Sequence, residues 1–205
     1  MATVVTKVFE YGQLEMDYLC RADVALGEAI RRLGKIERFV IPDLFAALVY
    51  AIVGQLISTK AVQTIWARMQ DRLGEITPHR LATCPVEEIQ QCGITMKKAT
   101  CIAEIAQQVA EGRFDLEGLS VLPDEEVIQR LSKLKGIGRW TAEMLLLLSM
   151  ERSDVVSWGD IAIRRGMMKL YGLPSLSKDQ FEGYRKTYSP YGSVASLYLW
   201  VVSFE

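Results

Sequence analysis

Residues 134–165 read LKGIGRWTAEMLLLLSMERSDVVSWGDIAIRR and hold the two features on which the interpretation of the whole chain depends. The first is the turn Gly136-Ile137-Gly138 between two segments with helical periodicity. Glycine permits a hairpin so tight that the amides starting the next helix point outward together, which makes a site for a phosphate, while Ile137 would fill the core beneath. Such a turn is also a common way to pack two helices, so alone it does not decide the function.

Asp160 is the second feature. The apolar helix RWTAEMLLLLSM is followed by the extended run VVSW, which carries Asp160 to the start of the helix IAIRRGMM. Aspartate is a good N-cap, and from the sequence alone capping is a simpler role for it than catalysis. The two roles are compatible, because a capping hydrogen bond holds the carboxylate in place.

Hydrophobic spacing predicts helices along most of the chain. One helix is expected over residues 16–34, ending at Gly34, and a second, fully buried one from Pro42 or Asp43 to about Gly54. Another should follow a cap at residue 58 or 59. The run TVVTKVF, residues 3–9, predicts an edge strand or an extended arm. About nine or ten helices with negligible strand make the class all-α.

A second glycine turn precedes the segment ITMKKAT. Gly93 separates two helical segments, and Lys97 and Lys98 lie in the first turn of the second. The pattern fits an ordinary helix-helix connection and a second turn that faces a nucleic-acid phosphate equally well.

Bulk composition narrows the class of protein. A chain of 205 residues, half of them hydrophobic, can bury a core without disulfides or metal. The runs LVYAIVG and MLLLLSM are far shorter than the roughly 20 residues that span a bilayer, and residues 1–15 lack a signal-peptide pattern. We therefore expect no membrane association and no secretion, with the protein in a bacterial cytoplasm or nucleoid, or in a nucleus if the source is eukaryotic.

The cysteines and the charge of the chain do not by themselves decide the function. Cys20, Cys84, Cys92 and Cys101 form no C-x-x-C pair, so reduced thiols are expected, and His79 is the only histidine, so no zinc site is expected. The net charge is −1, which argues against coating nucleic acid by charge alone. Residues 130–170 nevertheless hold eight basic and four acidic residues.

Taken in order, these motifs resemble those of the helix-hairpin-helix/Gly-Pro-Asp superfamily of DNA glycosylases, and most of all its alkylation-repair branch, the 3-methyladenine DNA glycosylase II type. The similarity runs from Phe45 through QLISTKAV, GITMKKA and the central stretch to YSPYGSVASLYLW, some three quarters of the chain. It implies a two-lobed all-α fold with the active-site cleft between the lobes. We expect an N-terminal segment over residues 1–40, a central lobe over 41–125, and the hairpin, catalytic region and C-terminal helices over 126–205.

The resemblance also implies a reaction. Asp160 would be the catalytic carboxylate, acting on a nucleotide flipped out of the duplex and stabilising the positive charge on the sugar as the base leaves. The substrates would be alkylated purines such as 3-methyladenine and 7-methylguanine. Relatives that also cut the strand carry a lysine where this chain has Trp140. The resemblance therefore implies a monofunctional enzyme that leaves an abasic site.

Further residues are implied around the base and along the DNA. Leu56 matches a wedge that enters the minor groove, although an apolar residue at a helix break is otherwise usually core. Met144 departs from a form that carries a pocket tyrosine, which leaves the substrate range open. The expected base-pocket residues are Trp140, Met144, Trp158, Tyr188 and Tyr191. The expected DNA-binding residues are Gln55, Leu56, Ser58, Lys135, Gly136, Ile137, Gly138, Arg139 and Thr141.

The resemblance implies no required cofactor. It does imply a Na⁺ or K⁺ ion held by the main-chain carbonyls of Ser132, Leu134 and Ile137. An iron-sulfur cluster is not expected, because no cysteine follows Cys101. With only about 40 residues before the similar region, the N-terminal sheet domain of larger bacterial relatives is not expected either.

The expected partner is double-stranded DNA with damaged bases, bound by a monomer. Two other functions stay open: a non-catalytic protein that binds damaged or abasic DNA, and a glycosylase for another modified purine. Asp160 argues against the first, and Trp140 with the aromatic pocket residues argues against the second.

Overall fold

The computed structural model describes residues 4–205, and nearly all of its regular structure is helical. Twelve α-helices and one 3-10 helix are present in this part of the chain, with a single two-stranded sheet formed by β1 (Lys7–Val8) and β2 (Phe39–Val40). The all-α prediction is confirmed. Of the predicted extended run 3–9, Thr3 lies outside the described residues and only β1 is a strand.

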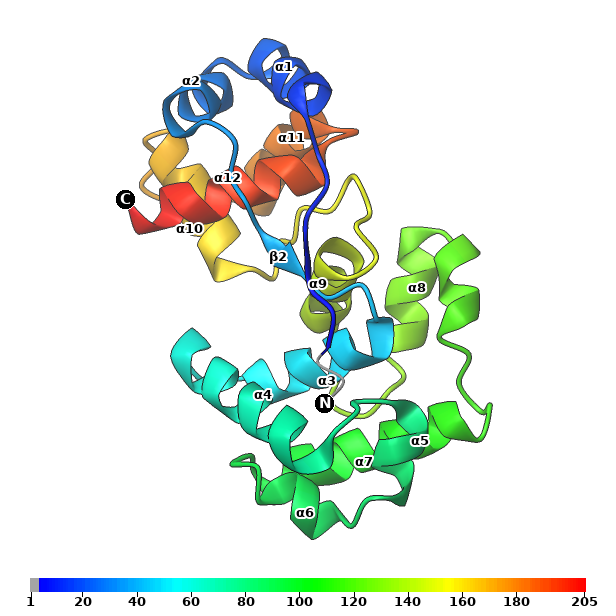
Figure 1. Cartoon of the computed structure of the whole chain (residues 1–205). Coiled ribbons are helices and arrows are strands. Elements are labelled where there is room, and N and C mark those ends of the chain that lie inside the picture. The colour runs from blue at the N-terminus through cyan, green and yellow to red at the C-terminus, as the bar shows by residue number, and fades with distance from the viewer. Residues whose placement is uncertain (1–3) are drawn as a thin grey trace. The chain divides into compact units, whose positions relative to one another are not determined.

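The chain forms two compact units (Figure 1). Unit 1 comprises residues 41–150 together with the N-terminal residues up to Lys7, and unit 2 comprises residues 8–40 and 151–205. This division differs from the ranges expected from the sequence. The hairpin region joins the central helices in unit 1, whereas the N-terminal helices join the C-terminal ones in unit 2. Asp160 and the glycine hairpin thus belong to different units.

Unit 1 is built around the apolar helix α3 (Leu44–Gly54), which contacts α4 (Thr59–Leu73), α7 (Met96–Ala110) and α9 (Arg139–Leu148). The side chain of Asp43 caps α3 by accepting a hydrogen bond from the Ala46 amide at 2.7 Å, so the predicted start is confirmed. Seven of the eleven residues of α3 are buried, as its composition predicts. The remaining elements of unit 1 are α5 (Pro78–Thr83), α6 (Val86–Gln90), the 3-10 helix η1 (Glu117–Val121) and α8 (Asp124–Leu131).

Unit 2 is built around α12 (Gly192–Phe204), in which ten residues are buried. It contacts α10 (Ile161–Leu170), α11 (Lys178–Tyr188) and the two N-terminal helices α1 (Gln13–Ala22) and α2 (Val24–Leu33), as Figure 1 shows. The single helix predicted over residues 16–34 is therefore wrong. Asp23 adopts an extended conformation and its side chain accepts a hydrogen bond from the Leu26 amide, so it ends α1 and caps α2.

The contact between α10 and α12 depends on Gly166. A Cβ atom at Gly166 would lie 2.1 Å from the Leu199 carbonyl oxygen of α12, far inside van der Waals contact. Since the clash is with backbone, the two helices could accommodate a side chain only by moving apart.

We predict that Gly166→Ala lowers the free energy of unfolding by about 1–3 kcal/mol through this overpacking. Gly183→Ala is the matched control, because Gly183 is also helical but has nothing within 4 Å of an added Cβ atom. That variant should be more stable by about 0.5–1 kcal/mol, since alanine is the better helix former. Urea unfolding followed by circular dichroism measures both. Equal effects would mean that the α10–α12 contact does not require glycine.

Candidate functional site

The hairpin in unit 1 joins α8 to α9. Ser132 ends α8, Gly138 is the N-cap of α9, and the Ile137 amide donates to the Leu134 carbonyl at 3.1 Å. Leu134 and Ile137 are buried, so the predicted role of Ile137 in filling the core is confirmed. The turn between them is exposed, which leaves its backbone accessible to a ligand.

The two glycines of the hairpin serve different purposes. Gly136 has a φ of +80°, and a Cβ there would lie 2.7 Å from the Cys101 sulfur, so both its conformation and its surroundings require glycine. Gly138 has a φ of −92° and nothing within 4 Å of an added Cβ. The fold therefore does not require glycine at position 138. A ligand whose phosphate backbone approaches this position closely would require a residue without a side chain.

The N-terminus of α9 is suited to an anion. Gly138 contributes no capping side chain to the first-turn amides of this ten-residue helix. Amides that have no acceptor within their own helix and the helix dipole together favour negative charge at such a position.

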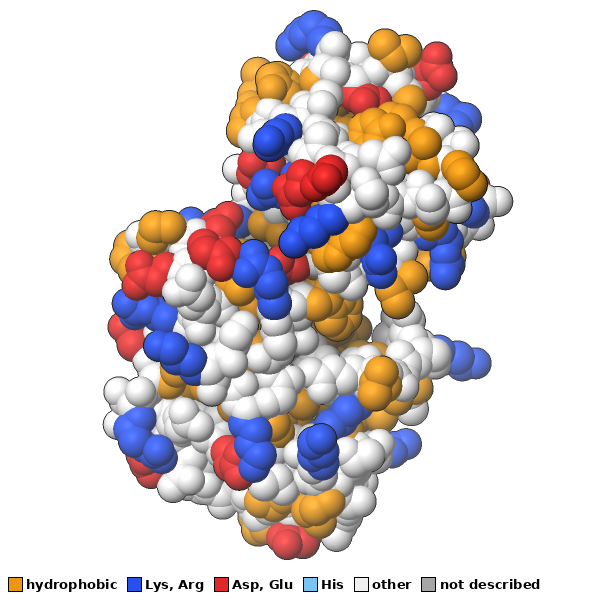
Figure 2. All heavy atoms as spheres, turned by 180° about the vertical axis from the view of Figure 1, so that it is seen from behind, with side chains coloured by type: hydrophobic (Ala, Val, Ile, Leu, Met, Phe, Trp, Pro, Cys, Tyr) orange, Lys and Arg blue, Asp and Glu red, His pale blue; other side chains and the backbone are white. Residues whose placement is uncertain are grey.

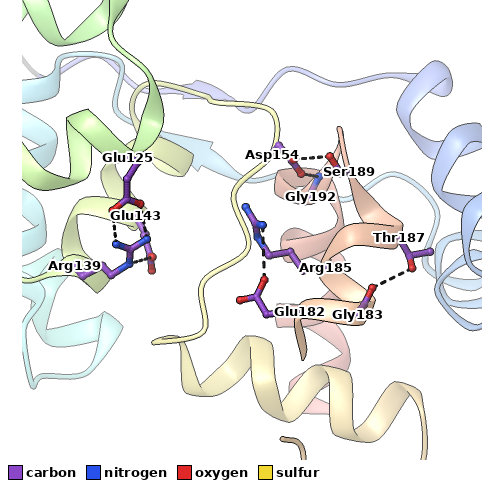
Figure 3. A network of polar contacts seen from close by, with 10 residues as sticks. All are labelled: Glu125, Arg139, Glu143, Asp154, Glu182, Gly183, Arg185, Thr187, Ser189 and Gly192. Carbon is purple, nitrogen blue, oxygen red and sulfur yellow. Dashed lines mark hydrogen bonds and ion pairs between the residues drawn. The ribbon is translucent and has the colours of Figure 1, made fainter. Parts of the chain in front are cut away.

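Two basic side chains at the hairpin, those of Lys135 and Arg139, are held in ion pairs. Arg139 donates two hydrogen bonds to Glu125 at 2.8 Å and one to Glu143 at 2.9 Å (Figure 3). The hydrogen bonds to Glu125 raise the pKa of Arg139 and lower that of Glu125. Lys135 pairs with Glu104 at 2.9 Å, which raises the lysine pKa. A phosphate would have to compete with these carboxylates for both predicted DNA contacts.

Acidic and basic side chains also mix on one face of the molecule. On the face drawn in Figure 2, lysine and arginine side chains lie interspersed with acidic ones. This face therefore carries mixed charge, in agreement with the net charge of −1. Thr141 is 5% exposed, so of its groups only the main-chain amide, in the first turn of α9, is placed for the predicted DNA contact.

The predicted wedge turn lies between α3 and α4. Leu56 is fully exposed, so the alternative of a core residue is excluded. Its φ of +60° is rare for leucine, and such a conformation costs on the order of 1–3 kcal/mol unless the surroundings hold it. Ser58 caps α4 by accepting a hydrogen bond from the Ala61 amide.

Two contacts connect this turn to the rest of unit 1. The Gln55 side chain donates to the Gly136 carbonyl at 2.9 Å, so the structure brings the QLIS turn and the hairpin together. Lys98 of α7 donates to the carbonyls of Val53 and Gln55 at 2.8 and 2.7 Å. Sequence reasoning weighed Lys98 only as a possible DNA contact, because no local pattern reveals a partner more than forty residues away.

The second glycine turn is a structural connection. Gly93 has a φ of +109° and packs against Arg68, whose guanidinium donates to the Cys92 carbonyl at 2.9 Å. Arg72 donates to the Gln91 carbonyl and side chain. With two arginines of α4 filling the space around this turn, the interpretation as a helix-helix connection is favoured over a DNA-facing turn.

The two pocket candidates of unit 1 lie one helical turn apart on α9. Trp140 is 44% exposed and therefore not a core residue, whereas Met144 is buried. Their spacing puts both on one side of the helix. A large aromatic surface is thus available next to the hairpin.

Asp160 in unit 2 is the N-cap of α10. Its Oδ1 atom accepts a hydrogen bond from the Ile163 amide at 2.9 Å, and the residue is only 7% exposed. The predicted capping role is confirmed. A carboxylate so fixed and so little hydrated is suited to stabilise a positive charge that develops beside it.

The segment that carries Asp160 is bound to the start of α12. Asp154 accepts hydrogen bonds from the Ser189 hydroxyl at 2.7 Å and the Gly192 amide at 3.1 Å (Figure 3). The Ser193 hydroxyl accepts from the Val155 amide, and the Ser196 hydroxyl donates to the Val155 carbonyl. Sequence reasoning assigned the SPYGS motif to a base pocket and missed this second role.

Aromatic residues of unit 2 have different environments. Trp158 is half-buried, packs edge-on against Phe181 and carries the Arg164 guanidinium 4.9 Å from its ring centroid. Tyr191 is half-buried and packs edge-on against Tyr18, a contact that no sequence motif indicates. Both predicted pocket residues therefore have part of their surface accessible.

Tyr188 does not fit its predicted role. It is fully buried, and its hydroxyl pairs at 2.6 Å with Tyr171, which in turn donates to Asp23 at 2.8 Å. Burial raises the pKa of both tyrosines. A ring with no exposed face cannot stack on a base, so the correction is that Tyr188 is a core residue linking α11, α10 and the start of α2.

Residues 49–190, which include the hairpin and Asp160, match the model of the HhH-GPD superfamily of base excision DNA repair proteins. The chain belongs to this superfamily. Within the part of the chain that the structure describes, no helix is long and apolar enough to cross a membrane, and no cluster of three or more His, Cys, Asp or Glu could hold a metal ion.

Individual relatives lie in the alkylation-repair branch. DNA-3-methyladenine glycosylase 1 of Schizosaccharomyces pombe is 32% identical over 164 residues, which cover 78% of this chain and 72% of the relative. The solved DNA-3-methyladenine glycosidase of Bacillus halodurans is similar with a TM-score of 0.80 and 32% identity, covering 97% of this chain and 92% of that one. A 3-methyladenine DNA glycosylase of S. pombe in complex with abasic DNA has a TM-score of 0.80 and 27% identity, with 92% and 95% covered. The predicted two-lobed helical glycosylase fold is confirmed.

The glycine pair gives a prediction for this superfamily member. Gly136→Val should lower the free energy of unfolding by about 2–4 kcal/mol, through the positive φ and the contact with Cys101. Gly138→Val should cost about 1 kcal/mol of stability or less as a poorer N-cap. It should still weaken duplex binding about tenfold, the equivalent of one hydrogen bond to a charged group. Urea unfolding and fluorescence anisotropy with duplex DNA measure the two effects; unchanged DNA affinity in folded Gly138→Val would show that the hairpin does not meet the backbone of DNA.

Proposed function

We propose that this protein is a DNA glycosylase of base excision repair, which hydrolyses the N-glycosidic bond of alkylated purines in duplex DNA. The observation that carries the proposal is Asp160: a nearly buried carboxylate, fixed as an N-cap, inside the region that matches the superfamily model. The names of the relatives support the class of substrate.

The proposed role of Asp160 is electrostatic. As the bond between base and sugar breaks, the sugar acquires positive charge, and a fixed carboxylate in a poorly hydrated position stabilises it without first having to reorganise. The same oxygen atoms can orient the attacking water. Alkylation of a purine ring makes the base cationic and a better leaving group, so modest assistance suffices for 3-methyladenine and 7-methylguanine.

DNA would be held mainly by backbone contacts. The amides of Gly138 and the first turn of α9 suit a phosphate, and Leu56 suits the space vacated by a flipped nucleotide, since its side chain is fully exposed. The Schizosaccharomyces relative solved with abasic DNA supports DNA as the partner. Trp140, Trp158 and Tyr191 retain accessible aromatic surface for an electron-poor base.

The proposed product is an abasic site in an unbroken strand. Cleavage through a Schiff base requires an amine beside the sugar, and the position that resembles the lysine of strand-cutting enzymes holds Trp140. An indole nitrogen is not nucleophilic enough to form this adduct. The reaction therefore stops once the N-glycosidic bond is hydrolysed and the base is released.

The hairpin also suits a monovalent cation. Ser132 ends α8 and Ile137 precedes the N-cap of α9, so their carbonyls and that of Leu134 come from one short turn, and main-chain oxygens are suitable ligands for Na⁺ or K⁺. When bound, the ion would supply positive charge close to a phosphate. No step of the proposed hydrolysis depends on it.

We predict that Asp160→Asn lowers the release of 3-methyladenine and 7-methylguanine from alkylated duplex DNA by at least about 100-fold. Asparagine keeps the N-cap of α10, so the charge is removed while the helix stays capped. Asp43→Asn is the matched control, because it makes the same exchange at the exposed N-cap of α3. Chromatography of the released bases measures the effect, and the DNA strand should break only after alkali.

Undiminished release by Asp160→Asn would overturn the role of this carboxylate. If the wild-type protein released no alkylated base but bound abasic DNA tightly, the protein would be a damage-binding protein without catalysis. If the protein released an oxidised or deaminated purine instead, the proposed substrate class would be wrong, but the proposed role of Asp160 would stand.

A further inference from the structure

The turn at Leu56 combines two energetically unfavourable properties. Its apolar side chain is fully exposed, and its backbone has a φ of +60°, a region that leucine rarely adopts. Burial of the side chain does not hold it there. The restraint must therefore come from the backbone on either side of the turn.

Lys98 contacts the backbone on the α3 side of this turn. Its ammonium donates to the Val53 carbonyl at 2.8 Å and to the Gln55 carbonyl at 2.7 Å, the carbonyls at the C-terminal end of α3. Those carbonyls have no partner within their own helix, and a cation is favoured at that end of the helix dipole. The carbonyl of Gln55 belongs to the peptide bond that leads directly into Leu56.

The position of Lys98 is that of an internal tie rather than a surface charge. The residue is half-buried, and burial lowers the pKa of its ammonium group, whereas its neighbour Lys97 is exposed. Two of the three N–H groups of Lys98 point at main-chain carbonyls of another helix. The Gln55 side chain extends the same connection to the hairpin through the Gly136 carbonyl.

We infer that Lys98 is a positioning residue that holds the Leu56 turn in the conformation in which the leucine can enter DNA. The inference rests on the proposed function, because it takes Leu56 as the wedge. Lys98 acts through Leu56 and touches neither the base nor the sugar. A merely structural lysine would stabilise the protein without affecting what Leu56 does, so the two roles can be separated.

A double-mutant cycle on DNA binding tests the inference. The dissociation constant for a duplex with a stable abasic-site analogue is measured by fluorescence anisotropy for Lys98→Met, Leu56→Ala and the double variant. Lys98→Met should weaken binding about tenfold in the wild-type background and less than about twofold in the Leu56→Ala background, because interacting residues are not additive. Equal losses in both backgrounds would overturn the inference.

Three controls separate the loss of the Lys98 hydrogen bonds from a loss of charge and from unfolding. Lys97→Met removes the same charge from the exposed neighbour, and it should weaken binding less than Lys98→Met at every salt concentration. Lys98→Arg keeps donors for both carbonyls and should recover most of the affinity. Urea unfolding shows whether each variant is folded; if Lys98→Met is not, Lys98→Gln, which retains a donor, enters the same cycle.

The outcome is distinguishable from a failure of the proposed function, since binding to an abasic analogue requires no turnover. If the wild-type protein releases no base but the cycle is non-additive, the enzymatic proposal fails and the role of Lys98 stands. If the wild-type protein does not prefer abasic over undamaged duplex, Leu56 is not a wedge and the inference on Lys98 falls.

Discussion

The hydrogen bond from the Ile163 amide to the Asp160 carboxylate stabilises the start of α10 and also fixes the orientation of the carboxylate. A capping bond contributes about 1 kcal/mol to the stability of a helix. Asp160 therefore stabilises the fold independently of any role in catalysis. The same bond removes the freedom that an unattached carboxylate would have to lose before it could act on a substrate. The proposed chemistry therefore uses a position that the helix already defines, and Asp154 and the serines of α12 secure the segment leading to it.

In unit 1 the groups proposed to meet DNA belong mainly to the backbone of the hairpin. Gly136 is needed for the turn itself, whereas Gly138 leaves space in front of amides that the helix cannot satisfy. The contact from Gln55 to the Gly136 carbonyl joins this turn to the one that presents Leu56. Lys135 and Arg139 beside this turn are paired with carboxylates, so we expect the shape of the turn and its amides, rather than a concentration of positive charge, to recognise DNA. Recognition by shape also agrees with a chain whose net charge is −1.

Local chemistry made much of the fold predictable. Two residues lie where their conformational preferences predict them: the glycine at the end of α2 and the aspartate before α3. The isoleucine of the hairpin is buried, as its hydrophobic side chain predicts. The break at Asp23 could have been found from the same rule, since an aspartate inside a helical pattern can cap a new helix. Partners distant in the sequence could not. The burial of Tyr188, the ion pairs of Arg139 and the tie from Lys98 depend on which helices lie next to each other, and periodicity alone does not determine that.

Two proposed roles decide whether this protein is a glycosylase: the hairpin of unit 1 binds the DNA backbone, and Asp160 of unit 2 acts on the sugar of the damaged nucleotide. A crystal structure of the protein bound to a duplex with an abasic-site analogue tests both roles most directly. We predict a phosphate against the amides of Gly138 and the first turn of α9, the Leu56 side chain in the gap in the base stack, and the Asp160 carboxylate beside the C1′ position of the analogue. A complex in which the hairpin met no phosphate, or in which Asp160 lay away from the sugar, would contradict these roles.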